Sequence, residues 1–172
     1  MRLAVVAYPR LDPETAAEIQ SFRVGHDPLA HRIPAHFTLV FPAEADAITL
    51  AEEIRLVAAS SAPVDFTLAR IDASVGIDGR CYVVLEATEG RACFETMHSR
   101  LHSGVLAGQL RRDVEYVPHV TVAVSEDAEE CGTLADDLRA TWSPAAGRIA
   151  ELVLLDLDDD PFRAVEVFRL HE

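Results

Sequence analysis

The chain has 172 residues, 49% hydrophobic and 26% charged, and a formal net charge of −14 at pH 7. This length and balance are typical of one globular domain and exclude an intrinsically disordered chain. All 15 basic residues are arginines, which excludes chemistries that need lysine, such as a Walker phosphate loop or a Schiff base, and the acidity argues against an extended nucleic-acid surface.

The apolar pattern predicts strands and helices in mixed order. In chain order we expect a strand over 2–8, a helix over 14–24, a loop over 26–35, a strand over 36–41, a helix over 46–60, strands over 64–72 and 81–87, a helix over 91–105, a strand over 119–124, a helix over 127–141, and a terminal hairpin of 151–157 and 164–170. The helix over 91–105 places Phe94, Met97, Leu101 and Val105 on one face. Strand pairs adjacent in sequence favour an α+β fold with largely antiparallel sheet.

No segment approaches the roughly 20 apolar residues that a membrane helix needs. Only six residues lie between Arg2 and Pro9, too few for the apolar part of a signal peptide. We therefore expect a cytoplasmic protein without a membrane partner. Cys81, Cys93 and Cys131 show no paired spacing, so the expectation is three unpaired thiols, with neither a disulfide nor a thiolate zinc site.

Two short stretches, HFTLV at 36–40 and HVTVA at 119–123, repeat the same pattern 83 residues apart. Side chains alternate between the two faces of a strand, so His36 and Thr38 share one face, about 7 Å apart. His119 and Thr121 do the same in the second stretch. Two such strands side by side or across a cleft would create a pocket with two imidazoles and two hydroxyls.

This pair of H-x-T-x motifs, each on an apolar strand, resembles the two-histidine phosphoesterase superfamily, which includes bacterial 2′-5′ RNA ligase-like proteins and RNA 2′,3′-cyclic phosphodiesterases. The resemblance spans most of the chain, at 2–9, 36–39, 116–124 and the terminal hairpin. It implies one bilobal domain over 1–172, with two pseudo-symmetric lobes of mainly antiparallel sheet and outer helices around a central cleft. Phe41 and Pro42 stand where the better-known members carry a glycine, which indicates a divergent subgroup.

Hydrolysis of a cyclic phosphodiester needs a base for the attacking water and an acid for the leaving ribose oxygen. Histidine suits both roles because its ordinary pKa is near neutrality. We therefore expect His36 and His119 to be the catalytic pair, with Thr38 and Thr121 binding the phosphate oxygens. The resemblance implies the same roles, no metal or other cofactor, and a 2′-phosphate product in RNA processing.

Other polar groups fit weaker hypotheses. His98 and His102 lie four residues apart but lack a third zinc ligand, and we expect them on a solvated helix flank. The stretch DLDDDP at 156–161 resembles the start of a calcium loop but has Pro161 where glycine is required, which indicates a solvated turn. Arg111 and Arg112 could meet a phosphate or a base, and Tyr116 could stack on a base or pack in the core.

The sequence leaves two alternatives open. The enzyme could act on a small molecule such as an ADP-ribose cyclic phosphate, or the chain could be a non-catalytic module that binds nucleotides or RNA ends. In each case we expect a monomer whose partner is a small nucleotide or an RNA end.

Overall fold

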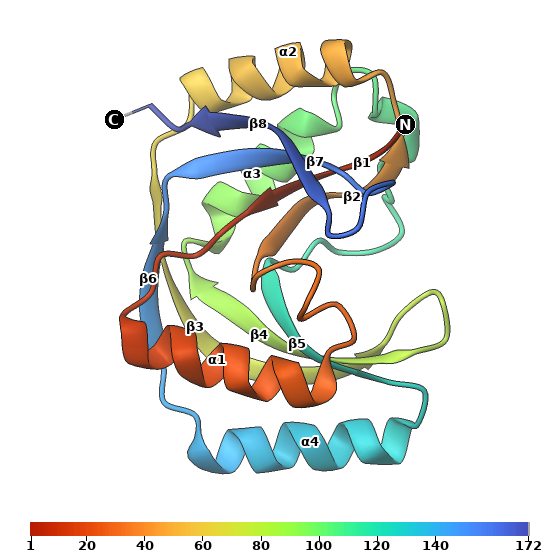
Figure 1. Ribbon diagram of the computed structural model, residues 1–172. Coiled ribbons are helices and arrows are strands. Elements are labelled where there is room, and N and C mark those ends of the chain that lie inside the picture. The colour runs from red at the N-terminus through yellow and green to blue at the C-terminus, as the bar shows by residue number, and fades with distance from the viewer. Residues whose placement is uncertain (172) are drawn as a thin grey trace.

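The computed structural model describes residues 1–171 and confirms an α+β fold built on one antiparallel sheet. Figure 1 shows the sheet strongly curved, with helices on its outer side. In this part of the chain the elements are β1 (Arg2–Ala7), α1 (Pro13–His26), β2 (Phe37–Glu44), α2 (Ala47–Ala59), β3 (Val64–Val75), β4 (Cys81–Glu89), α3 (Arg91–Leu101), a 3₁₀ turn (Ala107–Gln109), β5 (His119–Ser125), α4 (Ala128–Thr141), β6 (Ala145–Ile149), β7 (Glu151–Asp156) and β8 (Arg163–Arg169).

The sheet has the strand order β6-β3-β4-β5-β2-β1-β7-β8, and each neighbouring pair is antiparallel. It divides into a half made of β6, β3, β4 and β5 and a half made of β2, β1, β7 and β8. The two halves join where Phe37 of β2 faces Val120 of β5. Helices α1 and α4 pack against the first half and α2 packs against the second, which gives the two lobes (Figure 1).

The core on the outer side of the sheet contains the aromatic residues Phe37, Phe66 and Phe94. The Phe37 ring centroid lies 5.0 Å from that of Phe66 and 4.5 Å from that of Phe94, distances at which aromatic pairs attract. All three side chains are buried. Phe37 therefore anchors β2 to β3 and α3 next to the junction between the lobes.

A partly buried and a buried side chain satisfy the backbone of β2 directly after the junction. The Tyr116 hydroxyl donates to the carbonyl of Thr38 (3.0 Å), and His98 Nδ1 donates to the carbonyl of Leu39 (2.7 Å). The Tyr116 and His98 rings stack at 4.0 Å, and His102 follows with Nδ1 bonded to the His98 carbonyl. The expectation of a solvated flank for His98 and His102 was therefore wrong, because both are buried. His98 supplies the donor that the Leu39 carbonyl needs where β2 leaves β5, and the His102 ring packs against the His98 ring at 4.3 Å.

Helix α3 ends at Leu101, so the predicted extension to residue 105 was also wrong. The Glu53 carboxylate of α2 accepts a hydrogen bond from the Val105 backbone N–H (2.9 Å), which pulls the chain out of the helical path. Gly104 makes this approach feasible, because a Cβ there would collide with Glu53. Val105 is 47% exposed and does not join Phe94, Met97 and Leu101 in the core.

The edge strand β6 had no signal in the sequence, because AAGRI lacks both β-branched alternation and aromatic residues. It is held by its pairing with β3 and by two backbone hydrogen bonds between Arg10 and Arg148 (2.9 and 3.0 Å). Gly147 lets the Phe66 ring and the Arg10 backbone approach closely. Within the described residues, no helix is long and apolar enough to cross a membrane.

Cys81 and Cys131 form a disulfide, contrary to the expectation of three unpaired thiols. Cys81 begins β4 and Cys131 lies in the first turns of α4, so the bond fastens this helix to the outer side of the sheet. The spacing of 50 residues gave no hint of it, because the two positions meet only when α4 folds over the sheet. Cys93 is exposed and unbonded.

Reduction of this disulfide should lower the free energy of unfolding by about 3 kcal/mol, because an unbonded chain regains the entropy of a long loop. Denaturant unfolding with and without reductant measures the difference. The Cys93→Ser variant is the control and should show the same difference. Equal stability in the two conditions would contradict a stabilising role for the bond.

Candidate functional site

The four side chains predicted from the motifs lie together on the inner face of the sheet. Phe37 and Val120 are fully buried on the outer face, so their neighbours His36, Thr38, His119 and Thr121 point to the opposite face, where they are partly buried. An antiparallel register continued by one step to either side of the Phe37–Val120 pair would set His36 opposite Thr121 and Thr38 opposite His119. Side chains that face each other in this way lie about 5 Å apart, and those two positions apart on one strand about 7 Å. The four groups thus form a compact four-cornered arrangement, which we call the square, with the histidines on one diagonal.

Both imidazole rings are held in the same way. His36 Nδ1 lies 2.8 Å from the carbonyl oxygen of Pro34, and His119 Nδ1 lies 2.7 Å from that of Val117. A carbonyl can only accept, so Nδ1 carries the hydrogen in each ring and Nε2 is the nitrogen with a free lone pair. Neither Nε2 atom has a hydrogen-bond partner among residues 1–171. The equivalent hydrogen bonds, each two residues upstream, give the site an approximate twofold symmetry.

The two threonine hydroxyls are also available to a ligand. Neither makes a hydrogen bond to any of residues 1–171. Among residues 1–171, Glu53 Oε2 of α2 is a buried side-chain oxygen without a hydrogen-bond partner, and it lies outside the square. The site therefore presents two imidazole nitrogens and two hydroxyls to a bound molecule, a set able to transfer protons and to bind an anion.

Two further side chains on this face escaped the sequence analysis. Glu86 of β4 pairs with His119 in the register, is 7% exposed, and lies 3.4 Å from the Nε atom of Arg70. Tyr8 directly follows Ala7, whose partner in the register is Phe37, and so continues β1 towards the side on which His36 precedes β2. A charged residue inside the apolar run CYVVLEATE was a signal that could have revealed Glu86. Tyr8 had no comparable signal, because an aromatic residue is ordinary in a strand.

The electrostatic surroundings of the two histidines differ. Burial lowers the pKa of His36 to about 4. The Arg23 cation also lowers this pKa, whereas the hydrogen bond to Pro34 raises it. Burial also lowers the pKa of His119, but its hydrogen bond to Val117 and the Glu86 carboxylate oppose the decrease. The charges acting on His36 are thus those of the Arg23–Asp27 pair, which oppose each other, whereas the charge acting on His119 is the Glu86 anion. This difference favours His119 as the first ring to bind a proton.

A buried ion pair fixes the loop that leads into His36. Arg23 of α1 is fully buried, and its Nε and Nη2 atoms donate to Asp27 Oδ2 (2.9 and 2.8 Å). Its Nη1 atom donates to the carbonyl of Ile33 (3.1 Å), three residues before His36. Such a pair is costly to break, because either partner alone would be a buried unpaired charge. The loop before the first motif is therefore tied to α1.

Other predicted polar groups serve elsewhere. Arg111 pairs with Asp113 at 2.7 Å on the surface, and Arg112 is exposed. Tyr116 packs against the core and stacks on His98, which confirms the expectation of core packing over that of stacking on a base. No group of three or more His, Cys, Asp or Glu side chains within residues 1–171 is arranged to hold a metal ion.

Sequence comparisons identify relatives over most of the chain. Residues 11–161 match the family model described as 2'-5' RNA ligase superfamily. The protein named "Putative phosphoesterase GK0864" of Geobacillus kaustophilus (strain HTA426) is 29% identical over 125 residues, which cover 71% of this chain and 68% of the relative. A relative of the same type in Geobacillus sp. (strain WCH70), GWCH70_0799, is 31% identical over 105 residues, 59% of this chain and 58% of its own.

Solved structures share the fold over nearly the whole length. TT0787 of Thermus thermophilus has a TM-score of 0.64 at 18% identity, with 99% of this chain and 98% of the other covered. LigT of E. coli in its apo form has a TM-score of 0.58 at 22% identity and the same coverage. Usb1 of Kluyveromyces marxianus has a TM-score of 0.60 at 15% identity, covering 98% of both chains. At these identities the likeness shows a common fold.

The Glu86→Gln substitution should lower the pKa of His119, because it removes the negative charge that favours the protonated ring. The pKa of His36 should change less, since its closest charges are Arg23 and Asp27. NMR titration of both imidazole rings measures the two values. An unchanged pKa of His119 would show that Glu86 does not influence this ring.

The stability of the protein should fall as the pH decreases from 6.5 towards 4. His36 has a folded pKa of about 4 against an ordinary value of 6.5, so in this range the unfolded chain binds a proton that the folded chain does not. Urea unfolding at several pH values measures the slope, which should be shallower in His36→Gln. The variant His171→Gln, altered at an exposed position, is the control. Equal slopes in His36→Gln and the wild type would refute this origin of the pH dependence.

Proposed function

Because the chain belongs to the 2'-5' RNA ligase superfamily, we propose that it is a phosphoesterase that opens the 2′,3′-cyclic phosphate of a nucleotide or RNA end and leaves a 2′-phosphate. The observation that carries this proposal is the arrangement of His36 and His119 on one diagonal of a square, each with a free Nε2 atom. The threonine hydroxyls occupy the other diagonal. A phosphate at the centre has an imidazole on each of two opposite sides.

This arrangement matches the geometry of hydrolysis at phosphorus. Water attacks from one side while the bond from phosphorus to the ribose 3′ oxygen breaks on the other side. One neutral imidazole accepts the proton of the water at Nε2, and the other, protonated at Nε2, gives its proton to the leaving oxygen. The hydroxyls of Thr38 and Thr121 donate to the non-bridging oxygens and hold the phosphorus in line. The protein groups complete every proton transfer, so the proposed reaction requires no metal.

The charges around the site support acid and base roles for the same pair of rings. Burial lowers the pKa of both histidines, so the free protein holds neutral rings at pH 7 that can act as bases. A bound phosphate anion favours the protonated form of a neighbouring imidazole and so supplies the acid. The Glu86 carboxylate beside His119 acts in the same direction.

Related proteins support a substrate of nucleotide size. The LigT structures include complexes with phosphate and with 3'-AMP, and GK0864 is named for a phosphoesterase activity. The net charge of −14 disfavours a long polyanion, which leaves the end of an RNA or a free nucleotide. We propose that the protein acts as a monomer in RNA processing.

Replacement of His36 or His119 by alanine should reduce turnover of a nucleoside 2′,3′-cyclic phosphate by about 10² to 10⁴-fold, because each variant loses one proton-transfer group. The assay uses excess chelator from pH 5 to 9, and circular dichroism verifies folding. His171→Ala, altered at an exposed position outside the site, is the matched control.

The wild type should keep its activity in chelator and show a bell-shaped pH profile. A histidine variant with wild-type turnover would remove that residue from the mechanism. Loss of all turnover in chelator would refute the metal-free reaction. Tight binding of the cyclic nucleotide without turnover at any pH would instead identify a non-catalytic binding module.

A further inference from the structure

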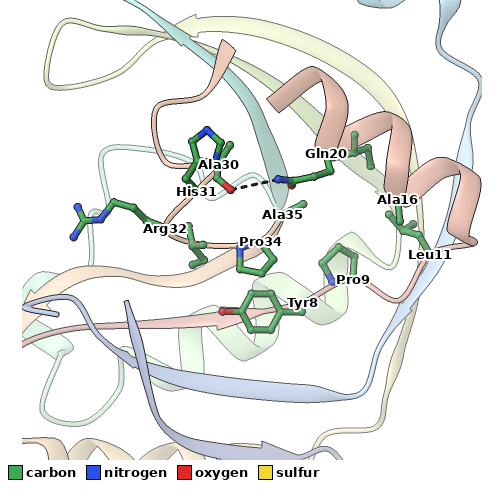
Figure 2. Close-up of a pocket in the computed structure, with 12 residues that line it drawn as sticks. Tyr8, Pro9, Leu11, Ala16, Gln20, Ala30, His31, Arg32, Pro34 and Ala35 are labelled. Atoms are coloured by element: carbon green, nitrogen blue, oxygen red, sulfur yellow. Dashed lines mark hydrogen bonds between the residues drawn. The ribbon is translucent and has the colours of Figure 1, made fainter. Parts of the chain in front are cut away.

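A cavity of about 580 Å³ opens beside the proposed catalytic square. It is enclosed by the residues that follow β1, one face of α1, and residues 30–35 of the loop, and we name it the α1 pocket. Figure 2 shows Tyr8 and Pro9, Ala16 and Gln20, and the loop residues gathered around it. Its volume lies within the range of small-molecule sites, roughly 300 to 1,000 Å³.

Two residues of the α1 pocket lie next to the first motif. Tyr8 lines the pocket and directly follows Ala7, whose partner in the β1–β2 register is Phe37, the neighbour of His36. Pro34 also lines the pocket, and its carbonyl holds the Nδ1 atom of His36. A ligand in the pocket thus contacts Pro34, the residue that also holds the His36 ring.

The walls suit an uncharged ring better than a second phosphate. Most are apolar, from Pro9, Leu11, Ile19, Ile33 and Pro34. The guanidinium groups near the pocket are already paired, Arg23 with Asp27 at 2.8 Å and Arg32 with Asp160 at 3.0 Å. The Arg32 side chain points away from the other residues drawn in Figure 2 and lies over the Phe162 ring at 4.2 Å. A pyrophosphate would find no unpaired arginine in these walls, which argues against an ADP-ribose chain extending into this pocket.

The polar groups at the pocket are few. Gln20 Nε2 donates to the carbonyl of Ala30 (3.3 Å), and Gln20 Oε1 accepts from Arg23, so its amide is occupied (Figure 2). The Tyr8 hydroxyl has no partner within residues 1–171, and burial raises its pKa, so it is neutral and able to donate. The ring of His31 lies at the exposed rim. A flat ring bound in the pocket would therefore contact apolar walls and could accept one hydrogen bond from the half-buried Tyr8 hydroxyl.

From these features we infer that the α1 pocket holds the nucleobase of the substrate, and that Tyr8 hydrogen-bonds the bound nucleoside. The inference rests on the proposed function, since it takes the reacting phosphate to lie between His36 and His119. The base of a nucleoside cyclic phosphate is joined to the ribose that carries the phosphate, so it must lie directly beside the phosphate site. Beside His36, the α1 pocket is the space with walls that fit such a ring.

The test fills the pocket from α1. Ala16 lines the pocket, is exposed and lies in the helix, so Ala16→Trp adds a large ring without disturbing the core. Ala17→Trp is the matched control, because Ala17 lies on α1 but outside the pocket. Tyr8→Phe removes the hydroxyl alone. Each protein is assayed on adenosine 2′,3′-cyclic phosphate and on ribose 2′,3′-cyclic phosphate, which has no base.

Ala16→Trp should lower kcat/KM for the adenosine substrate by about tenfold or more, because the base loses its buried site, and should change kcat/KM for the base-free substrate by less than about twofold. Tyr8→Phe should lower kcat/KM for the adenosine substrate about two- to tenfold, as expected for one hydrogen bond. Ala17→Trp should match the wild type on both substrates. Equal effects of Ala16→Trp and Ala17→Trp, or equal losses on both substrates, would overturn the inference.

A second measurement keeps the inference separate from the catalytic proposal. Calorimetry with adenosine, which carries no phosphate, reports on the pocket without any turnover. Adenosine should bind the wild type and Ala17→Trp alike, and Ala16→Trp about tenfold more weakly or worse. If the wild type hydrolyses neither substrate but this difference in adenosine affinity is found, the proposed reaction fails and the base site stands. If both substrates are hydrolysed and Ala16→Trp leaves adenosine affinity unchanged, the base site fails and the reaction stands.

Discussion

The pairing of Phe37 with Val120 is the contact on which the rest of the structure depends. It joins β2 to β5, and thereby one half of the sheet to the other. Both residues are fully buried on the outer face, which forces the residue on either side of each toward the inner face. A shift of one residue in this pairing would turn the two motif side chains of the shifted strand into the core. Packing of the Phe37 ring against Phe66 and Phe94 makes that shift unfavourable.

The site combines a symmetric backbone with asymmetric charges. Each histidine holds its Nδ1 hydrogen on a carbonyl two residues upstream, so the two strands present the same ring atom in the same way. The residues that break the symmetry come from neighbouring elements, Arg23 from α1 and Glu86 from β4. A reaction that needs one base and one acid benefits from two similar rings with different proton affinities. The two strands thus orient both imidazole rings in the same way, and the neighbouring charges give the rings different proton affinities.

The acidic surface and the α1 pocket restrict the substrate in complementary ways. A net charge of −14 opposes a long polyanion, while the arginines around the pocket are already paired with carboxylates. The buried Arg23–Asp27 pair serves the loop geometry and leaves the pocket walls mainly apolar. A single nucleotide or a terminal one satisfies both restrictions, because its phosphate meets the histidines and its base meets an uncharged pocket.

The sequence by itself determined the order of most helices and strands, the antiparallel α+β class and the four motif residues, because local periodicity fixes which face of a strand each side chain occupies. The repeated motif identified His36, Thr38, His119 and Thr121 without any knowledge of the pairing. Contacts between residues distant in the chain decided the rest. The burial of His98 and His102, the Cys81–Cys131 bond, strand β6 and the positions of Tyr8 and Glu86 all depend on strand order or on how a helix packs over the sheet. Such contacts have no local signature, since their partners become neighbours only when distant segments of the chain fold together.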